Sequence, residues 1–109
     1  MVIGLDFYGT ITKNPKFFRQ LTAALIAAGH LVYIISAVGE ANVEKLKKDV
    51  RHSHVSHTAL EIITFIDFEF VSGLKAEACK RLGVQCLIDD SDENCRDATK
   101  LGVMSFMVR

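Results

Sequence analysis

The stretch Val2-Ile-Gly-Leu-Asp-Phe-Tyr-Gly-Thr-Ile-Thr12 decides the fold of this chain. It opens with a short apolar run that ends at a charged residue, Asp6. Such a run is typical of a buried parallel strand whose carboxyl end lies at a functional site. Gly9 and Thr10 then favour a turn. The sequence therefore predicts a strand over Met1–Phe7 that brings Asp6 to one edge of a sheet.

Outward from this stretch, helical and strand patterns alternate. The spacing predicts a helix over residues 15–28, with Asn14 as N-cap, Pro15 at the first position and Gly29 as its stop. Further strands are predicted over residues 31–35, 62–71, 84–88 and 103–108, helices over 40–51, 75–82 and 93–101, and a loop over 52–58. In the third strand, Asp67 and Glu69 are expected on an outer face or an edge. Alternation of this kind predicts an α/β fold with a parallel sheet, whose ligands bind beyond the carboxyl ends of the strands.

Length and composition favour one globular domain over residues 1–109. Half of the 109 residues are apolar, and 13 basic residues balance 13 acidic ones, so the net charge gives no clear signal for nucleic acid or for an anionic membrane. No apolar stretch approaches the ~20 residues of a membrane span, which favours a cytoplasmic protein. The odd cysteine count without zinc spacing fits reduced, buried thiols at Cys79, Cys86 and Cys95.

Polar residues stand where several predicted strands end. Ser36 follows the second strand directly, and Asp89 and Asp90 close the fourth. Adjacent carboxylates repel each other unless a cation or hydrogen-bond donors compensate them, so this pair favours a metal site. The alternative is a capping role for the following helix, which fits Asp92 and Asn94 better.

The segment Leu5–Thr12 resembles the first motif of the haloacid-dehalogenase-like phosphohydrolase superfamily, an apolar strand followed by Asp-x-Asp-Gly-Thr. The resemblance implies that Asp6 is a nucleophile that forms an aspartyl-phosphate. It continues in order along the chain. Ser36, with the amide of Ala37, matches the second motif, which holds phosphoryl oxygens. Lys75 matches the third motif, a lysine that stabilises negative charge, and Leu87–Asn94 matches the acidic fourth motif.

This resemblance covers nearly the whole chain and implies a fold as well as a site. The expected fold is a Rossmann-like three-layer sandwich, with a parallel five-stranded sheet of order 3-2-1-4-5 and no cap domain. Gly9 and Thr10 are expected beside the phosphate. A Mg²⁺ ion is the implied cofactor, held by the side chain of Asp6 and the backbone carbonyl of Tyr8. Either Asp90 or Asp89 completes the set, with Asp90 favoured as the direct ligand.

Tyr8 departs from the pattern, because it stands where the superfamily has its acid/base aspartate. A phenol with a pKa near ~10 is a poor base at pH 7, and loss of a positioned acid/base costs roughly 10²–10⁴ in rate. The chain also has no room for a cap, so its site is expected to be open. The expected partner is a phosphorylated substrate, bulky or macromolecular, and an aromatic strand at the edge of the sheet is compatible with a homo-oligomer.

Two hypotheses follow from these residues. In the first, the chain is a Mg²⁺-dependent phosphatase or phosphotransferase whose turnover Tyr8 impairs or alters. In the second, it is a regulatory or interaction module that keeps the metal and phosphate sites without turnover. Two other features have ordinary explanations: the histidines at 52, 54 and 57 fit a solvated loop better than a metal site, and the lysines of residues 45–48 fit a solvated helix face.

Overall fold

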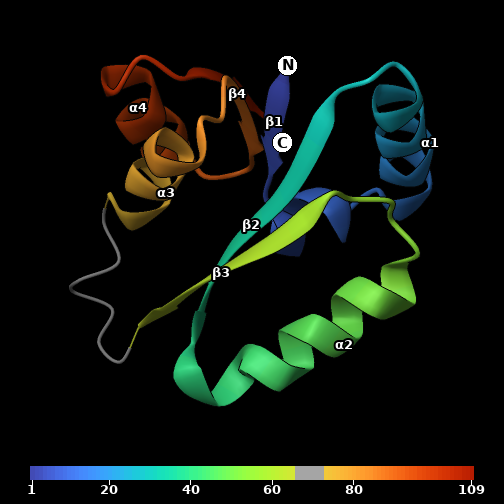
Figure 1. Cartoon of the computed structure of the whole chain (residues 1–109). Coiled ribbons are helices and arrows are strands. Elements are labelled where there is room, and N and C mark those ends of the chain that lie inside the picture. The colour runs from blue at the N-terminus through green and yellow to red at the C-terminus, as the bar shows by residue number, and fades with distance from the viewer. Residues whose placement is uncertain (66–72) are drawn as a thin grey trace.

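The structure of the chain is a computed structural model that describes residues 1–65 and 73–109. Its centre is a five-stranded, wholly parallel sheet of order β3-β2-β1-β4-β5, which confirms the predicted α/β fold and strand order (Figure 1). The strands are β1 (Val2–Leu5), β2 (Leu31–Gly39), β3 (Ala59–Phe65), β4 (Cys86–Asp89) and β5 (Met104–Met107). Leu5 at the end of β1 pairs with Ile34 of β2 and with Ile88 of β4, so Asp6 lies between these two neighbouring strands.

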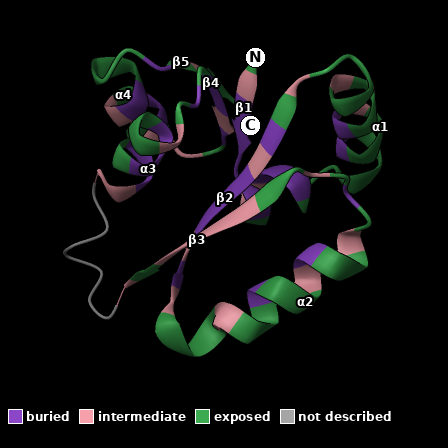
Figure 2. Ribbon diagram, viewed as in Figure 1, coloured by how far each residue is buried: buried purple, intermediate pink, exposed green. Residues whose placement is uncertain are grey.

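Helices cover both faces of the sheet and give the three layers (Figure 1). On one face lie α1 (Pro15–Ala27) and α2 (Val43–Ser53), and on the other lie α3 (Leu74–Leu82) and α4 (Asp92–Lys100). Side chains alternate between the two cores along β2: Ile34 packs in the core of α1 and α2, and Ile35 in the core of α3 and α4. Figure 2 shows the resulting pattern on α2, with buried residues toward the sheet and exposed ones outside.

The predicted strand boundaries differ most from the structure at β2 and β3. The second strand was expected to end at Ile35, but β2 continues through Ser36 to Gly39. It continues because residues 36–39 pair with residues 62–65 of β3, which satisfies their backbone groups. β3 itself begins at Ala59 and not at Ile62. The remainder of the predicted third strand, with Asp67 and Glu69, lies outside the described residues.

This pairing makes β2 and β3 a two-stranded ribbon that extends past the end of β1. β1 stops at the level of Ile34, whereas β2 runs five residues further, to Gly39 beside Phe65. We call residues 36–39 and 62–65 the β2–β3 ribbon. The ribbon lies beside the carboxyl end of β1, where the site is expected.

Helix ends differ from the predictions in smaller ways. Pro15 begins α1 as predicted, but the side chain of Asn14 makes no capping hydrogen bond. The predicted helix over 40–51 is a turn of 3₁₀ helix, Glu40–Asn42, followed by α2, which extends to Ser53. It therefore takes up the start of the predicted loop. His54 ends it in a left-handed conformation with φ 55°.

The three cysteines are free and buried, as predicted. Burial raises the pKa of Cys79 to about 11, so this thiol is not ionised near neutral pH. No helix within residues 1–65 and 73–109 is long and apolar enough to cross a membrane.

Candidate metal and phosphate site

Asp6 leaves the sheet at the end of β1 and enters a kinked turn, η1 (Phe7–Ile11). Its amide still donates to Ile88 O of β4 at 2.9 Å, which fixes its backbone to the sheet. Gly9 takes φ +86°, a conformation that side chains rarely adopt, and the amide of Thr12 closes the turn on Phe7 O at 3.1 Å. As a result the Asp6 carboxyl is held almost completely buried, with 6% of the residue exposed.

A buried lysine joins Asp6 to the end of β4. Lys75 Nζ donates to Asp6 Oδ1 at 2.7 Å and to Asp89 Oδ2 at 2.8 Å. The lysine lies in the first turn of α3, which begins after Gly73, and only 4% of it is exposed. A lysine in a first helical turn is most often a solvated surface residue, but the structure places Lys75 between two of the predicted site residues.

Burial also changes the acidity of the Asp6 carboxyl. Its pKa is raised to about 7, mainly because burial removes hydration, an effect that outweighs the attraction of the Lys75 ammonium. The neighbouring carboxylates of Asp89 and Asp90 contribute to this rise. For Lys75, burial lowers the pKa, but the attraction of Asp6 and Asp89 outweighs it and the pKa lies above its ordinary value. The lysine therefore stays charged near neutral pH.

Asp89 is fully buried and has donors on both oxygens. Besides Lys75, it accepts from the amide of Ser91 at Oδ1 (2.9 Å) and from Asn94 Nδ2 at Oδ2 (3.2 Å). Ser91 is also the N-cap of α4, because its hydroxyl accepts from the amide of Asn94. The capping role considered for Asp92 and Asn94 thus belongs to Ser91, and the Asn94 side chain instead orients Asp89.

Asp90 completes a group of three carboxylates. One oxygen from each of Asp6, Asp89 and Asp90 lies within 4.8 Å of the others. Asp90 is exposed and packs against η1, where a Cβ on Gly9 would lie 2.3 Å from Asp90 Oδ2. Carboxylate oxygens are the ligands that Mg²⁺ prefers, and the ion binds through one or two of them and retains water. One exposed and two buried carboxylates fit such an ion.

Tyr8 points away from these carboxylates. Its hydroxyl donates to Asp49 Oδ2 on α2 at 2.6 Å, and Lys45 donates to the same oxygen at 2.8 Å. The Lys45 ammonium also lies 5.3 Å from the centre of the tyrosine ring. Asp49 raises the pKa of the phenol, after burial as the larger cause. The side chain at the acid/base position is therefore engaged with α2. Sequence analysis missed Asp49, which lies on an amphipathic helix 41 residues away.

The residues predicted to hold phosphate are all near Asp6, in different environments. Thr10 is buried and its hydroxyl donates to Asp6 Oδ2 at 2.9 Å, so it supports the carboxyl directly. The amide of Gly9 donates to Thr12 Oγ1 at 2.9 Å and serves the turn. Ser36 and Ala37 lie on β2 just beyond the level at which β1 ends, with Ser36 buried.

Asp90 also lines an open hollow of about 550 Å³ at the surface. Lys13, Arg96 and Arg109 contribute positive charge to it, although Arg96 also pairs with Asp92 at 3.0 Å. These positive side chains offset the repulsion that the Asp90 carboxylate would exert on an approaching anion. The three histidines at 52, 54 and 57 form no metal-binding group with other residues of the described part of the chain.

Comparison with known proteins supports the architecture of the chain. No family model matches the sequence, and neither does any curated protein. Among solved structures, a chain of the Pnkp1/Rnl/Hen1 complex is similar, with a TM-score of 0.76 and 15% identity over 98% of this chain and 45% of that one. The present chain thus spans less than half of the length of that chain. At this identity the similarity supports the architecture and says nothing of activity.

Proposed function

We propose that the chain is a Mg²⁺-dependent phosphohydrolase or phosphotransferase of the haloacid-dehalogenase-like type, with Asp6 as its nucleophile. The observation that carries the proposal is the environment of Asp6, a buried carboxyl within hydrogen-bond distance of Lys75 and Thr10, with Asp89 and Asp90 beside it. A carboxylate that must attack an anionic phosphate needs compensating positive charge, and the lysine supplies part of it.

The proposed reaction has two displacements. An Asp6 oxygen attacks phosphorus, the bond from phosphorus to the leaving oxygen breaks, and that oxygen takes up a proton. Water then attacks the aspartyl-phosphate, which releases inorganic phosphate, returns the carboxylate and frees a proton; another acceptor in place of water gives phosphotransfer. Lys75 stays paired with Asp6 and offsets the charge of the incoming group. Ser36 and Ala37 are the proposed contacts for phosphoryl oxygens.

The site fits a divalent cation beside these residues. Asp6, Asp90 and the backbone carbonyl of Tyr8 are its proposed ligands, with Asp89 held by Lys75, Ser91 and Asn94 at the edge of that set. Bound there, Mg²⁺ would neutralise charge on the phosphate and on the attacking carboxylate. Asp6 must be ionised to attack. Because its pKa is raised to about 7, the fraction of molecules with ionised Asp6 at neutral pH depends on the positive charge beside it.

Tyr8 favours a second candidate function. Its hydroxyl donates a hydrogen bond to Asp49, so the side chain is not placed to act as an acid/base catalyst at Asp6. In this alternative the chain forms or mimics a phosphorylated state at Asp6 and acts as a regulatory module, with little or no turnover. Both candidates use the same residues. They differ in the fate of the phosphoryl group, because release from Asp6 requires an activated water.

An assay with an aryl phosphate and Mg²⁺ tests the proposal. Turnover by the wild type that Asp6→Asn abolishes would support the enzyme. An inert wild type whose activity Tyr8→Asp restores would support the regulatory module. If the wild type binds neither Mg²⁺ nor the phosphate mimic BeF₃⁻, both candidates are wrong.

We further propose a cytoplasmic protein that acts on phosphorylated substrates at an open site. The three free, buried cysteines suit a reducing compartment. The edge position of β3 leaves pairing with a second copy available as a route to a homo-oligomer, which sedimentation would test.

A further inference from the structure

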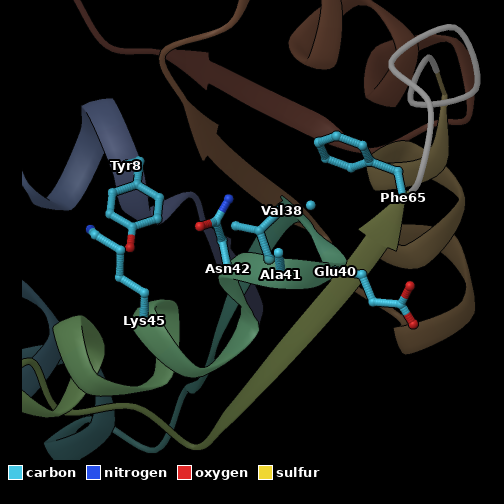
Figure 3. Close-up of a pocket in the computed structure, with 8 residues that line it drawn as sticks. Tyr8, Val38, Glu40, Ala41, Asn42, Lys45 and Phe65 are labelled. Carbon is cyan, nitrogen blue, oxygen red and sulfur yellow. The ribbon is translucent and has the colours of Figure 1, made fainter.

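A pocket lies beside the β2–β3 ribbon (Figure 3). Its volume is about 750 Å³, within the range of small-molecule sites. It is lined by the kinked turn after β1, the end of β2, the start of α2 and the end of β3. We call it the ribbon pocket. The residues that carry the argument are Tyr8, Val38, Ala41, Asn42, Lys45 and Phe65.

The ribbon pocket begins where the proposed phosphate site ends. Tyr8 is two residues beyond Asp6 on one chain segment, and Val38 is two residues beyond Ser36 on the other. Two residues of backbone span at most about 7 Å. If a phosphoryl group is held between Asp6 and Ser36, its leaving group can therefore reach the pocket.

Two aromatic side chains lie at opposite ends of the ribbon pocket. Figure 3 shows Tyr8 with Lys45 at one end and Phe65 at the other, with Val38 and Ala41 between them. Aromatic rings pair favourably with other planar rings in offset or edge-to-face arrangements. The walls of the pocket therefore suit a flat, apolar group.

Tyr8 is held in place before any ligand arrives. Although 37% of it is exposed, its hydroxyl is bound to Asp49 and its ring has the Lys45 ammonium 5.3 Å from its centre. A wall that is already ordered costs less conformational entropy on binding. This arrangement gives a use for the tyrosine at a position where it cannot serve as a base.

Asn42 provides a polar group along the same wall. It occupies the N-cap position of α2, yet its side chain makes no capping hydrogen bond. Its amide offers both a donor and an acceptor, which is the pattern that pairs with the edge of a heteroaromatic ring. The pocket thus combines aromatic side chains at its two ends with the amide of Asn42 and the charged side chains of Glu40 and Lys45.

From these features we infer that the ribbon pocket binds the leaving group of the substrate, and that this group is a planar aromatic ring. The inference rests on the proposed function, since it names the class of substrate for the Asp6 site: phosphomonoesters of aromatic alcohols or of nucleosides. Tyr8 and Phe65 contact the ring, and Asn42 contacts its polar edge.

The kinetic test compares an aromatic with an aliphatic ester. For 2-(1-naphthyl)ethyl phosphate against glycerol phosphate, two alkyl esters with similarly basic leaving groups, kcat/KM should be about tenfold or more in favour of the aromatic ester, the scale expected for an aromatic contact. Phe65→Ala should reduce that ratio several-fold, because it removes one of the two aromatic side chains of the pocket. The matched control is Phe17→Ala on α1, an exposed phenylalanine that does not line the pocket, which should leave the ratio unchanged. Equal rates for the two esters would overturn the inference.

A binding test without phosphate separates this inference from the proposed function. Adenosine and 1-naphthol are titrated into the ¹⁵N-labelled protein, and the amide signals of Val38, Ala41 and Asn42 are followed. Shifts at these amides without any turnover would retain the pocket and overturn the enzyme. Turnover without shifts and without preference would retain the enzyme and overturn the pocket. Stronger binding of adenosine than of naphthol identifies nucleotides as the substrates, and the reverse identifies simple aryl esters.

Discussion

The hydroxyl of Tyr8 donates a hydrogen bond of 2.6 Å to Asp49 Oδ2, which ties the turn after β1 to the second turn of α2. This bond directs the tyrosine side chain away from Asp6. A residue that stands at the expected acid/base position thus contributes to the surface beside the site. A sequence motif specifies the place of residue 8 in the chain. It does not specify the direction of its side chain, which here is toward α2.

The first prediction concerns the hydroxyl of Tyr8. Tyr8→Phe should leave any phosphatase activity within about threefold of wild type, because the phenol is bound to Asp49 and transfers no proton in the reaction. Removing a partly exposed hydrogen bond should lower the free energy of unfolding by about 1 kcal/mol or less. Steady-state kinetics and urea unfolding measure the two effects. A loss of activity above tenfold, with stability unchanged, would assign the hydroxyl a chemical role.

The second prediction concerns Lys75. Lys75→Met leaves Asp6 and Asp89 buried without their shared cation, and removal of one partner from a buried ion pair costs about 3–5 kcal/mol. Urea unfolding at pH 8 in EDTA measures this loss. The control is Lys47→Met, which removes an exposed pair with Glu44 at 3.5 Å and should cost less than about 1 kcal/mol. Similar losses in the two variants would show that the buried bridge contributes little.

The third prediction concerns the pH dependence that Asp6 confers without metal. Its folded-state pKa of about 7 lies above the ordinary 3.8, so protonated Asp6 favours the folded state. This contribution is complete below pH 3.8 and is lost as the pH rises through about 7, by an amount on the order of a few kcal/mol. Asp6→Asn carries no charge and should therefore raise the melting temperature in EDTA at pH 8.

At pH 5 the gain from Asp6→Asn should be much smaller, because wild-type Asp6 is then mostly protonated. Thermal unfolding of wild type and Asp6→Asn between pH 5 and pH 8 gives the difference in their melting temperatures. Groups that titrate alike in both proteins do not affect this difference. A variant that is less stable than wild type at pH 8 would mean that the ion pair with Lys75 outweighs the cost of burying the carboxylate.

The fourth prediction concerns Mg²⁺. Binding to the folded state stabilises it by mass action, so excess Mg²⁺ should raise the melting temperature of the wild type. Asp90→Asn should reduce this shift strongly, because Asp90 belongs to the group of three close carboxylates. Asp92→Asn, two residues away on the exposed start of α4, is the matched control and should retain the shift. Equal responses from the two variants would argue against a site at Asp90.

The fifth prediction concerns Gly9. Gly9→Ala introduces both a left-handed strain, at φ +86°, and a Cβ that would lie 2.3 Å from Asp90 Oδ2. Gly29→Ala, at φ +92° with nothing within 4 Å of the new Cβ, carries the strain without the contact. Each should destabilise the fold by about 1 kcal/mol through strain. Only Gly9→Ala should also weaken the Mg²⁺-dependent shift, as calorimetry would detect.

The order of the elements and the positions of Asp6 and Asp89 at the ends of β1 and β4 could be predicted because they depend on local pattern. Apolar runs that close on Asp6 and Asp89 place both residues at one edge of the sheet, and the motif resemblance supplied the strand order that the structure has. The length of β2 could not be predicted in this way. Ser36 marks a polar break in the sequence, but the strand continues because its backbone pairs with β3.

Contacts between distant segments were the hardest to predict. Nothing around Asp49 distinguishes it from the other charged residues of an amphipathic helix, and its partner Tyr8 lies 41 positions earlier. Ser91 was missed as well, although its contacts are local: its hydroxyl caps α4 and its amide donates to Asp89. In both cases the deciding factor is the direction of a side chain in the folded chain, which periodicity does not specify.

The bridge from Lys75 to Asp6 spans 69 positions of sequence and crosses from α3 to the end of β1. Closing a loop of that length costs entropy that only the assembled sheet offsets, so the bridge has no counterpart in an early, local folding event. A fragment that ends at Phe65 would contain Asp6 yet lack the lysine that pairs with it. Formation of this ion pair therefore requires segments from both ends of the chain to be folded together, so the environment of Asp6 depends on the cooperativity of the whole domain.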